Sequence, residues 1–372
     1  MLERLYYCRI WKLNINYDKT KIVIFGSRKI DKHVFKMDNN IIEIVKSYKY
    51  LGVIMTSNGS FLNARKCIYE KASKAMHLLH KRIQNLNLPL DLQLKLFDST
   101  ILPIITYGCE IWGYENLEMF ERIHTKFLRS ITKCRKSTPL YMLYGELGRY
   151  PLKITIKTRI IGFWTRIITG NQYKFVNLLY QKLYQIGVHQ FKWLKNVQSI
   201  LQEVGRNDLW IKQNEVISKN TQYTVKQILM DQFVQKWRQS LTQSSKAINY
   251  SLLKDDFIFE QYLTILPKNK YIPLIKYRTA NHFLPVETLR WQAIDISDRK
   301  CTLCNKQDTA DEFHFLFICE YFESHRKLYI KPYYYKRPNI LKYKELFSSK
   351  SPLKLSNLSK FASLIMKEFK RQ

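Results

Sequence analysis

The alternation of apolar and polar residues divides the chain into a short mixed front part and a long helical remainder. Up to about residue 57 the apolar runs have the period of two that is typical of strands, with turn residues between them. The expected strands cover 21–25, 34–37, 41–45 and 48–55. Because Asp38, Asn39 and Asn40 lie between the second and third runs, these two are expected to form a hairpin.

From about residue 60 the period of the apolar positions changes to that of a helix. The expected helices cover 61–86, 90–110 and 115–133, and a long helical block covers about 151–270. Within this block an apolar residue recurs at every fourth position, which is typical of a helix face in a core. The residues are Leu229, Phe233, Trp237 and Leu241. The predicted fold class is α+β, mostly α-helical.

Charge adds information about the partner. The 372 residues include 62 Lys and Arg against 30 Asp and Glu, a formal net charge of +32. Such an excess repels itself unless an anionic partner neutralises it. An acidic membrane surface or an acidic protein could serve, but the charge is interleaved with 25 Tyr and 20 Phe. Aromatic faces stack on bases while Lys and Arg hold phosphates, so RNA or DNA is the favoured partner.

Cysteine usage and apolar runs indicate the compartment. The seven cysteines are odd in number and form no regular framework, and the start of the chain has no signal-peptide pattern. A reducing, intracellular location in nucleus or cytoplasm is therefore expected. The apolar run at 101–107 is too short to cross a bilayer, so no membrane association is expected.

Four residues near the carboxy terminus have the spacing of a metal site. Cys301 and Cys304 form a Cys-x2-Cys pair, and His314 and Cys319 follow. Zinc prefers four such ligands in a tetrahedron, and the two-residue gap lets both thiolates reach one ion. Since four protein ligands leave no open position, a structural zinc ion is expected, which would stabilise a segment too small to build its own core.

The spacing of the last two ligands sets a condition on the local backbone. In a continuous helix, residues five apart point about 140° away from each other. A helix that begins near residues 311–312 must therefore break or tighten before Cys319, or the ligand set is different. His325 is the alternative ligand in that case.

Segments at both ends of the chain resemble LINE-type (non-LTR) retrotransposon reverse transcriptases, in the order of that family. LNINYDKTK at 13–21 resembles the segment just after the catalytic Asp pair, and YKYLG at 48–52 resembles the primer-grip hairpin. ILPIITYGCEIWG at 101–113 resembles the thumb helix. KYRTANHFLPVET at 276–288, with EFHFLFIC at 312–319, resembles the carboxy-terminal zinc element.

The resemblance implies a binding function without polymerase activity of the chain's own. Polymerases of this family hold two Mg²⁺ ions on Asp residues of the palm, and that Asp motif would lie before residue 1. No catalytic residue and no Mg²⁺ are therefore expected here, and an upstream polymerase half is a candidate partner. The pair Asp255 and Asp256 is expected to be solvated helix surface.

The resemblance also implies a division of the chain into five segments. They are a palm remnant with a primer-grip-like hairpin at 1–57, a helical thumb at 58–150, a helical connector at 151–270, a zinc-binding element at 271–330 and a basic tail at 331–372. The tail has two interpretations: a flexible phosphate-binding extension, or a solvated end with one amphipathic helix near 359–370.

Six cations are the candidate nucleic-acid contacts. They are Lys19, Lys21, Lys49, Arg278, Arg299 and Lys300. Two other interpretations of the whole chain stay open. One is a zinc-stabilised, basic helical scaffold for protein interactions. The other is a non-functional remnant of a decayed element, in which strands of a severed palm sheet would expose their edges.

Overall fold

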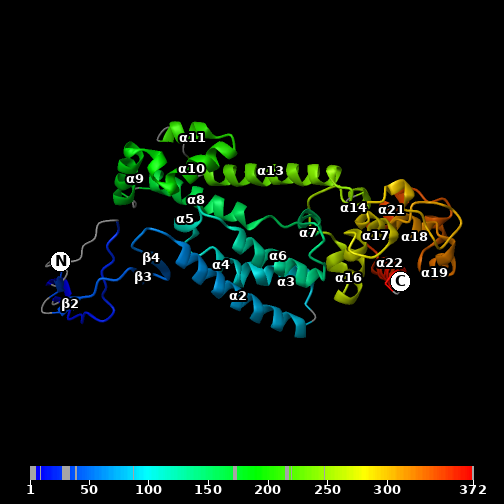
Figure 1. Ribbon diagram of the computed structural model, residues 1–372, viewed down its shortest axis with the longest axis horizontal. Helices are drawn as coiled ribbons and strands as arrows, with labels where there is room; N and C mark the ends of the chain where they lie inside the picture. The colour runs from blue at the N-terminus through cyan, green and yellow to red at the C-terminus, as the bar shows by residue number, and fades with distance from the viewer. Residues whose placement is uncertain are drawn as a thin grey trace. The chain divides into compact units, whose positions relative to one another are not determined.

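The structure is a computed structural model that describes every residue except 1–5, 9, 27–33, 38–39, 87, 171–173, 214–217, 219, 247 and 371–372. The chain forms two compact units, Met1–Ser73 and Lys74–Gln372. Helices dominate, and the sheets of the described residues are two antiparallel pairs of strands (Figure 1). The predicted class, α+β and mostly α-helical, is confirmed.

The first unit contains two short hairpins. Strand β1 (Phe35–Met37) pairs with β2 (Asn40–Ile42), as predicted, although residues 38 and 39 of the turn lie outside the described residues. Strand β3 (Ser47–Tyr50) pairs with β4 (Val53–Thr56). Between them Leu51 and Gly52 both have positive φ, at 44° and 86°. This is the backbone of a tight two-residue hairpin loop, which matches the right-handed twist of the strands.

The prediction of a strand at 21–25 is wrong. Ile22 alone among these residues pairs with another segment, through a parallel bridge to Ile44. The amide of Ile22 donates to the carbonyl of Glu43 at 3.0 Å, and Val45 donates to Ile22 at 2.8 Å. The bridge partner Ile44 lies beyond the end of β2 at Ile42, so the residues around Ile22 do not extend a sheet.

The helices that follow are close to those predicted, with one exception. Helix α2 (Leu62–Asn85) begins in the first unit and ends in the second. The next helices are α3 (Leu90–Thr100), α4 (Leu102–Ile105), α5 (Cys109–Trp112), α6 (Glu118–Thr132), α7 (Leu140–Glu146) and α8 (Leu152–Thr169). Helices α2 and α6 confirm the predictions at 61–86 and 115–133.

The exception is the single helix expected over 90–110, which is divided into α3, α4 and α5. Pro103 lies in the first turn of α4, where its missing N–H costs nothing but where it cannot continue the preceding helix. Gly108 has φ 63°, a left-handed conformation that glycine adopts without strain, and α5 begins directly after it.

The core of the second unit includes the interface between α8 and α13 (Thr221–Gln243), which pack along each other (Figure 1). A Cβ atom at Gly162 would lie 2.5 Å from the side-chain amide of Gln222, so a larger residue there would displace that side chain. The predicted stripe on α13 is confirmed as core. Trp237 is 1% exposed, and the ring of Phe233 meets Phe257 edge-on at 5.5 Å.

The remaining helices continue in chain order. On the amino-terminal side of α13 they are α9 (Lys174–Ile186), η2 (Val188–Gln190), α10 (Lys192–Glu203) and α11 (Asn207–Ile211). After α13 they are α14 (Ile248–Leu253), α15 (Tyr262–Ile265), α16 (Lys268–Arg278), α17 (Pro285–Trp291), η3 (Ile296–Asp298), α18 (Glu312–Phe317), η4 (Glu320–Phe322), α19 (Glu323–Tyr329), α20 (Pro332–Tyr335), α21 (Ile340–Phe347) and α22 (Pro352–Glu368). None of the helices in the described residues is both long and apolar enough to cross a bilayer.

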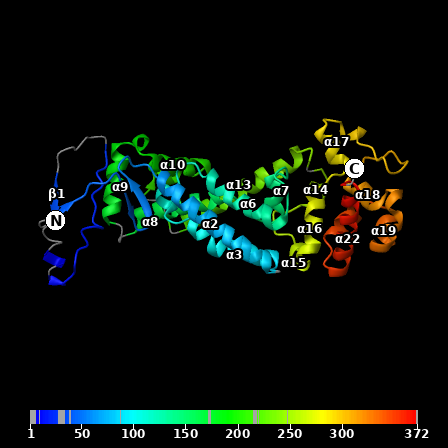
Figure 2. The same ribbon diagram turned by 60° about the horizontal axis from the view of Figure 1, so that its bottom comes forward.

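The basic end of the chain is packed rather than extended. Helix α22 lies against α16 and α18 (Figure 2). Its Leu355, Phe361 and Ile365 side chains are fully buried. The hydroxyl of Ser359 donates to the carbonyl of Lys270 at 2.6 Å, which ties α22 to α16. A flexible extension over 352–368 is therefore contradicted, since this burial gives the helix a hydrophobic contact with the fold. The finer five-segment division stays a prediction.

Candidate metal centre

Three thiols and one imidazole converge in the carboxy-terminal part of the second unit. They belong to Cys301, Cys304, His314 and Cys319, whose ligand atoms all lie within 4.8 Å of one another. The sulfurs of Cys301 and Cys319 are 3.9 Å apart, and the sulfur of Cys304 is 3.4 Å from Nε2 of His314. Two thiolates at about 2.3 Å from a tetrahedral ion would be about 3.8 Å apart. The cluster therefore has the dimensions of a four-ligand metal site.

The first two ligands lie on a short turn between paired backbone segments. Lys300 and Thr309 form an antiparallel bridge. The amide of Cys301 donates to the carbonyl of Asp308 at 3.0 Å, and Ala310 donates to Arg299 at 2.7 Å. These bonds hold both ends of the turn that carries Cys301 and Cys304.

The last two ligands are placed by a helix that ends before Cys319. The Asp311 side chain caps α18 by accepting from the amide of His314 at 2.8 Å. The helix ends at Phe317, and Ile318 and Cys319 both donate to the carbonyl of His314, at 2.8 and 2.9 Å. This ending is the break that the spacing requires, and it turns Cys319 toward the other ligands.

The alternative ligand stays outside the cluster. His325 lies on α19 and is absent from the group of four, while its Nδ1 atom is buried without a hydrogen-bond partner. The sequence-based choice of His314 therefore agrees with the geometry.

Sequence reasoning missed two residues that lie beside the ligands. The carboxylate of Asp308 lies 3.3 Å from Nδ1 of His314, the ring nitrogen that points away from the sulfurs. The buried guanidinium of Arg326 donates to the carbonyls of Cys319 at 2.7 Å and Leu316 at 2.8 Å. Nδ1 of His314 forms no hydrogen bond, so Asp308 is near the ring without being bonded to it. Arg326 does form hydrogen bonds, and outer residues that do so fix the orientation of ligands. An acidic residue beside the Cys-x2-Cys turn is the signal that could have indicated Asp308.

The electrostatics of the cluster favour a thiolate. A hydrogen bond from the thiol of Cys319 lowers the pKa of Cys301 to about 4 and raises the pKa of Cys319, because the two sulfurs share one proton. Burial, followed by the charge of Glu312, raises the pKa of Asp311 to about 6. A divalent cation would take the place of the shared proton and allow both sulfurs to ionise.

The segment before the cluster anchors it to the helices. The hydroxyl of Tyr277 donates to the carbonyl of Glu312 at 2.6 Å, and the carboxylate of Glu312 lies 2.8 Å from Nε2 of His282. Asn249 of α14 donates to the same carboxylate. The run at 276–288 therefore positions the first turn of α18, which carries His314.

Four of the six predicted nucleic-acid contacts lie at or near the surface. They are Lys19, Lys21, Lys49 and Lys300. Lys19, Lys49 and Lys300 are exposed. Lys21 is half-buried and forms an ion pair with Glu43 at 2.6 Å. The first three of the four belong to the first unit, whereas Lys300 belongs to the second.

The other two predicted contacts are in the interior. Arg278 donates to both carboxylate oxygens of Glu146 at 2.9–3.2 Å, and its NH2 group lies 3.3 Å from Glu260. Arg299 donates to the carbonyls of Ile294 at 2.9 Å and Val286 at 3.1 Å. Both guanidinium groups donate to acceptors within the protein, so we no longer propose either one as a phosphate contact.

The pair Asp255 and Asp256 is exposed, as expected, but follows the end of α14 instead of lying within a helix. The carboxylate of Asp255 accepts from the ammonium of Lys344 at 2.9 Å. This contact joins Asp255, which follows α14, to Lys344 of α21 at the surface of the fold.

Comparison with known proteins identifies one relationship. The chain is 26% identical over 135 residues to a protein described as a probable RNA-directed DNA polymerase from transposon X-element of Drosophila melanogaster. The match covers 34% of this chain and 14% of that protein. Part of this chain is thus distantly related to an RNA-directed DNA polymerase of a transposon. No protein-family profile and no solved structure matches the chain.

Proposed function

We propose that the chain is a nucleic-acid-binding part of a reverse-transcriptase-related protein, which grips RNA or an RNA–DNA duplex and has no polymerase site of its own. The observation that carries this proposal is the 135-residue match to a transposon RNA-directed DNA polymerase. The net charge of +32 supports it, because an anionic polymer would neutralise the repulsion among the 62 Lys and Arg residues.

Within this proposal the metal is a structural Zn²⁺ ion. Three sulfurs and one imidazole nitrogen are the donors that zinc prefers, and they are poor ligands for Mg²⁺ or Ca²⁺. Cys301, Cys304, His314 and Cys319 would fill all four positions, which leaves none for substrate. When bound, the ion supplies cross-linking of the turn at 301–304 to the end of α18, and with it folding energy.

The chain is expected to give no primer extension with Mg²⁺, deoxynucleoside triphosphates and a primed RNA template. The expectation follows from the absence of the family's paired Asp motif from the sequence, since phosphoryl transfer needs metal ions held on such carboxylates. The measurement is a gel assay of a labelled primer, with a commercial reverse transcriptase as the positive control. Template-dependent extension above a no-enzyme control would contradict the proposal of a non-catalytic chain.

A second candidate function is a zinc-stabilised scaffold for protein interactions. Helix α9 favours it, because Phe175 is 88% exposed and Leu178 and Leu179 are more than half exposed. Apolar side chains gathered on one exposed helix are typical of protein contacts.

A competition experiment separates the two candidates. Binding of a structured RNA is measured at moderate salt in the presence of increasing heparin. A nucleic-acid grip predicts that RNA is retained at a heparin excess that removes a merely electrostatic ligand, since base stacking and shape add to the charge. If heparin displaces the RNA when its sulfate groups are no more concentrated than the RNA phosphates, the basic scaffold is favoured.

A further inference from the structure

Cations of three separate segments lie around the carboxy-terminal end of α16 in the second unit. Lys276 of α16 is half-buried, and the charged groups around it are Lys370, Arg135 and Lys133 together with the thiol of Cys134. Burial, followed by the charge of Lys370, lowers the pKa of Lys276. Like charges placed in this way repel each other, and an anion that joined them would reduce the repulsion. We name Lys133, Arg135, Lys276 and Lys370 the cationic face.

The backbone holds the cationic face in place. Lys133 ends α6 with φ 56°, which turns the chain into the loop at 133–138. The guanidinium of Arg129 donates to the carbonyls of Arg135 and Thr138 and thereby fixes this loop. The sulfur of Cys134 lies 3.9 Å from the hydroxyl of Thr279, directly after α16. Because α16 also packs on α22, the three segments are joined through buried contacts.

An aromatic pair lies next to the cationic face. The guanidinium of Arg135 is 3.8 Å from the centroid of the Phe283 ring. Trp291 meets the same ring edge-on, with centroids 6.1 Å apart and an interplanar angle of 83°. Trp291 is 50% exposed, so much of its surface is available to a ligand. The arrangement combines an exposed ring with adjacent cations, which is the combination that binds unpaired nucleotides.

The acidic group of α17 is already paired. Glu287 of α17 accepts from Arg290 at 2.9 Å and lies 3.6 Å from Lys246, and its side chain is 3% exposed. Two cations therefore face this one buried carboxylate. The pKa of Lys246 is lowered, mainly by burial, and the positive charge of Arg135 contributes to the shift.

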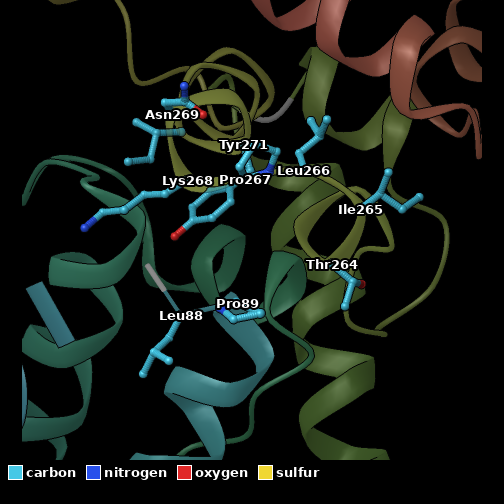
Figure 3. A pocket seen from close by; sticks show the side chains of 10 residues that line it. Leu88, Pro89, Thr264, Ile265, Leu266, Pro267, Lys268, Asn269 and Tyr271 are labelled. Carbon is cyan, nitrogen blue, oxygen red and sulfur yellow. The ribbon is translucent and has the colours of Figure 1, made fainter. Parts of the chain in front are cut away.

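The positive charge continues from the cationic face toward a cavity. Burial, followed by the charges of Lys133 and Lys268, lowers the pKa of His80. Lys268 lines a cavity of about 920 Å³ between the start of α3 and the start of α16. Figure 3 shows Lys268 and Tyr271 on one side of this cavity and Leu88 and Pro89 on the other.

We propose that the cationic face binds a single-stranded segment of nucleic acid, with an unpaired base stacked on Trp291. The inference rests on the proposed nucleic-acid-binding function and names the surface and the strandedness of the ligand. Phosphates contact Lys133, Lys276 and Lys370. A single strand is favoured over a duplex because bases inside a duplex are already stacked on each other and cannot reach the indole ring.

The test compares two strands that share a backbone. The zinc-loaded full chain is titrated into a fluorescent oligothymidylate and into an abasic deoxyribose-phosphate strand of equal length, and anisotropy is measured. Trp291→Ala is expected to weaken binding of the oligothymidylate roughly tenfold and to leave the abasic strand unchanged. Trp291→Phe is expected to keep most of the affinity, since its ring can still stack.

Replacing the lysines is expected to change binding in a different way from replacing Trp291. Combined Lys133→Ala, Lys276→Ala and Lys370→Ala is expected to weaken both strands and to reduce the salt slope by about 2, since three released counterions each contribute about 0.7 on a single strand. Tyr223→Ala and Lys236→Ala change an exposed ring and an exposed cation of α13 and serve as matched controls. Far-UV circular dichroism and zinc content verify that each variant is folded.

The outcomes separate this inference from the proposed function. Wild-type affinity in Trp291→Ala, or an equal loss on both strands, overturns the stacking site while the nucleic-acid-binding function stands. Failure of the wild-type chain to bind either strand at low salt overturns both. A loss confined to the oligothymidylate, absent from the Tyr223→Ala control, supports the inference.

Discussion

Replacement of Cys301 and Cys304 by Ser is expected to lower bound zinc from about one ion per chain to near none. Two of the four donors in the cluster are lost, and a serine hydroxyl stays protonated and binds zinc weakly. The turn at 301–304 would then lose its link to the metal and keep the backbone hydrogen bonds that join Cys301 to Asp308 and Arg299 to Ala310. Metal content after gel filtration, measured by plasma mass spectrometry, gives the result directly.

The matched control is Cys67→Ser, which changes a half-buried thiol of α2 outside the cluster. It is expected to retain one zinc ion per chain. Full zinc content in the Cys301→Ser, Cys304→Ser variant would place the metal elsewhere and would contradict the assignment of the ligands. Substitution by Co²⁺ adds a check on geometry, because a tetrahedral thiolate site gives the absorption expected of that coordination.

Replacement of Arg278 by Met is expected to reduce the free energy of unfolding by about 3–5 kcal/mol, since it leaves the carboxylate of Glu146 buried without its cation. Glu146 is fully buried and accepts from Arg278 and, at 2.6 Å, from the hydroxyl of Tyr262. Urea unfolding followed by circular dichroism measures the change. A cooperative transition of the wild-type chain would also argue against a remnant that cannot fold.

Two further variants test the cause of this loss. Combined Glu146→Gln and Arg278→Met removes both charges and is expected to recover part of the stability, because no charge is then left unpaired. Asp208→Asn breaks the exposed ion pair of Arg206 and Asp208 and is expected to leave the midpoint nearly unchanged. A midpoint of Arg278→Met equal to that of wild type would show that the buried pair does not stabilise the fold.

The metal cluster could be predicted from the sequence because its information is local. The Cys-x2-Cys spacing requires a tight turn, and the spacing of His314 and Cys319 requires a helix end between them. Both are properties of a few neighbouring residues, and the structure contains both. The single strand expected over 48–55 is wrong, because the chain reverses at Leu51 and Gly52 and the two halves pair with each other. Only the resemblance of 48–52 to a primer-grip hairpin indicated this turn.

The fates of Arg278 and Arg299 could not be predicted, because their partners are distant along the chain or are backbone carbonyls. Glu146 is 132 residues away from Arg278. Arg299 is satisfied by the carbonyls of Ile294 and Val286, which carry no side-chain signal in the sequence. An arginine in a basic segment therefore looks like a phosphate contact until tertiary packing assigns its acceptors.

The basic composition of the carboxy-terminal end also failed to indicate how it is packed. Its lysines suggested a solvated or flexible extension, yet apolar residues of α22 at helical spacing are fully buried against α16 and α18. The lysines Lys360 and Lys367 occupy the exposed face of the same helix. Net charge reports the surface of a segment and says nothing about the opposite face.

The most direct test of the central claim is the affinity of the zinc-loaded chain for a structured RNA across a salt series, with heparin measured in parallel. We expect affinity to fall steeply and linearly with the logarithm of salt concentration, and RNA to be bound more tightly than heparin at moderate salt. Equal affinity for both polyanions, or no binding of RNA, would contradict a nucleic-acid grip and leave the basic scaffold or the decayed remnant.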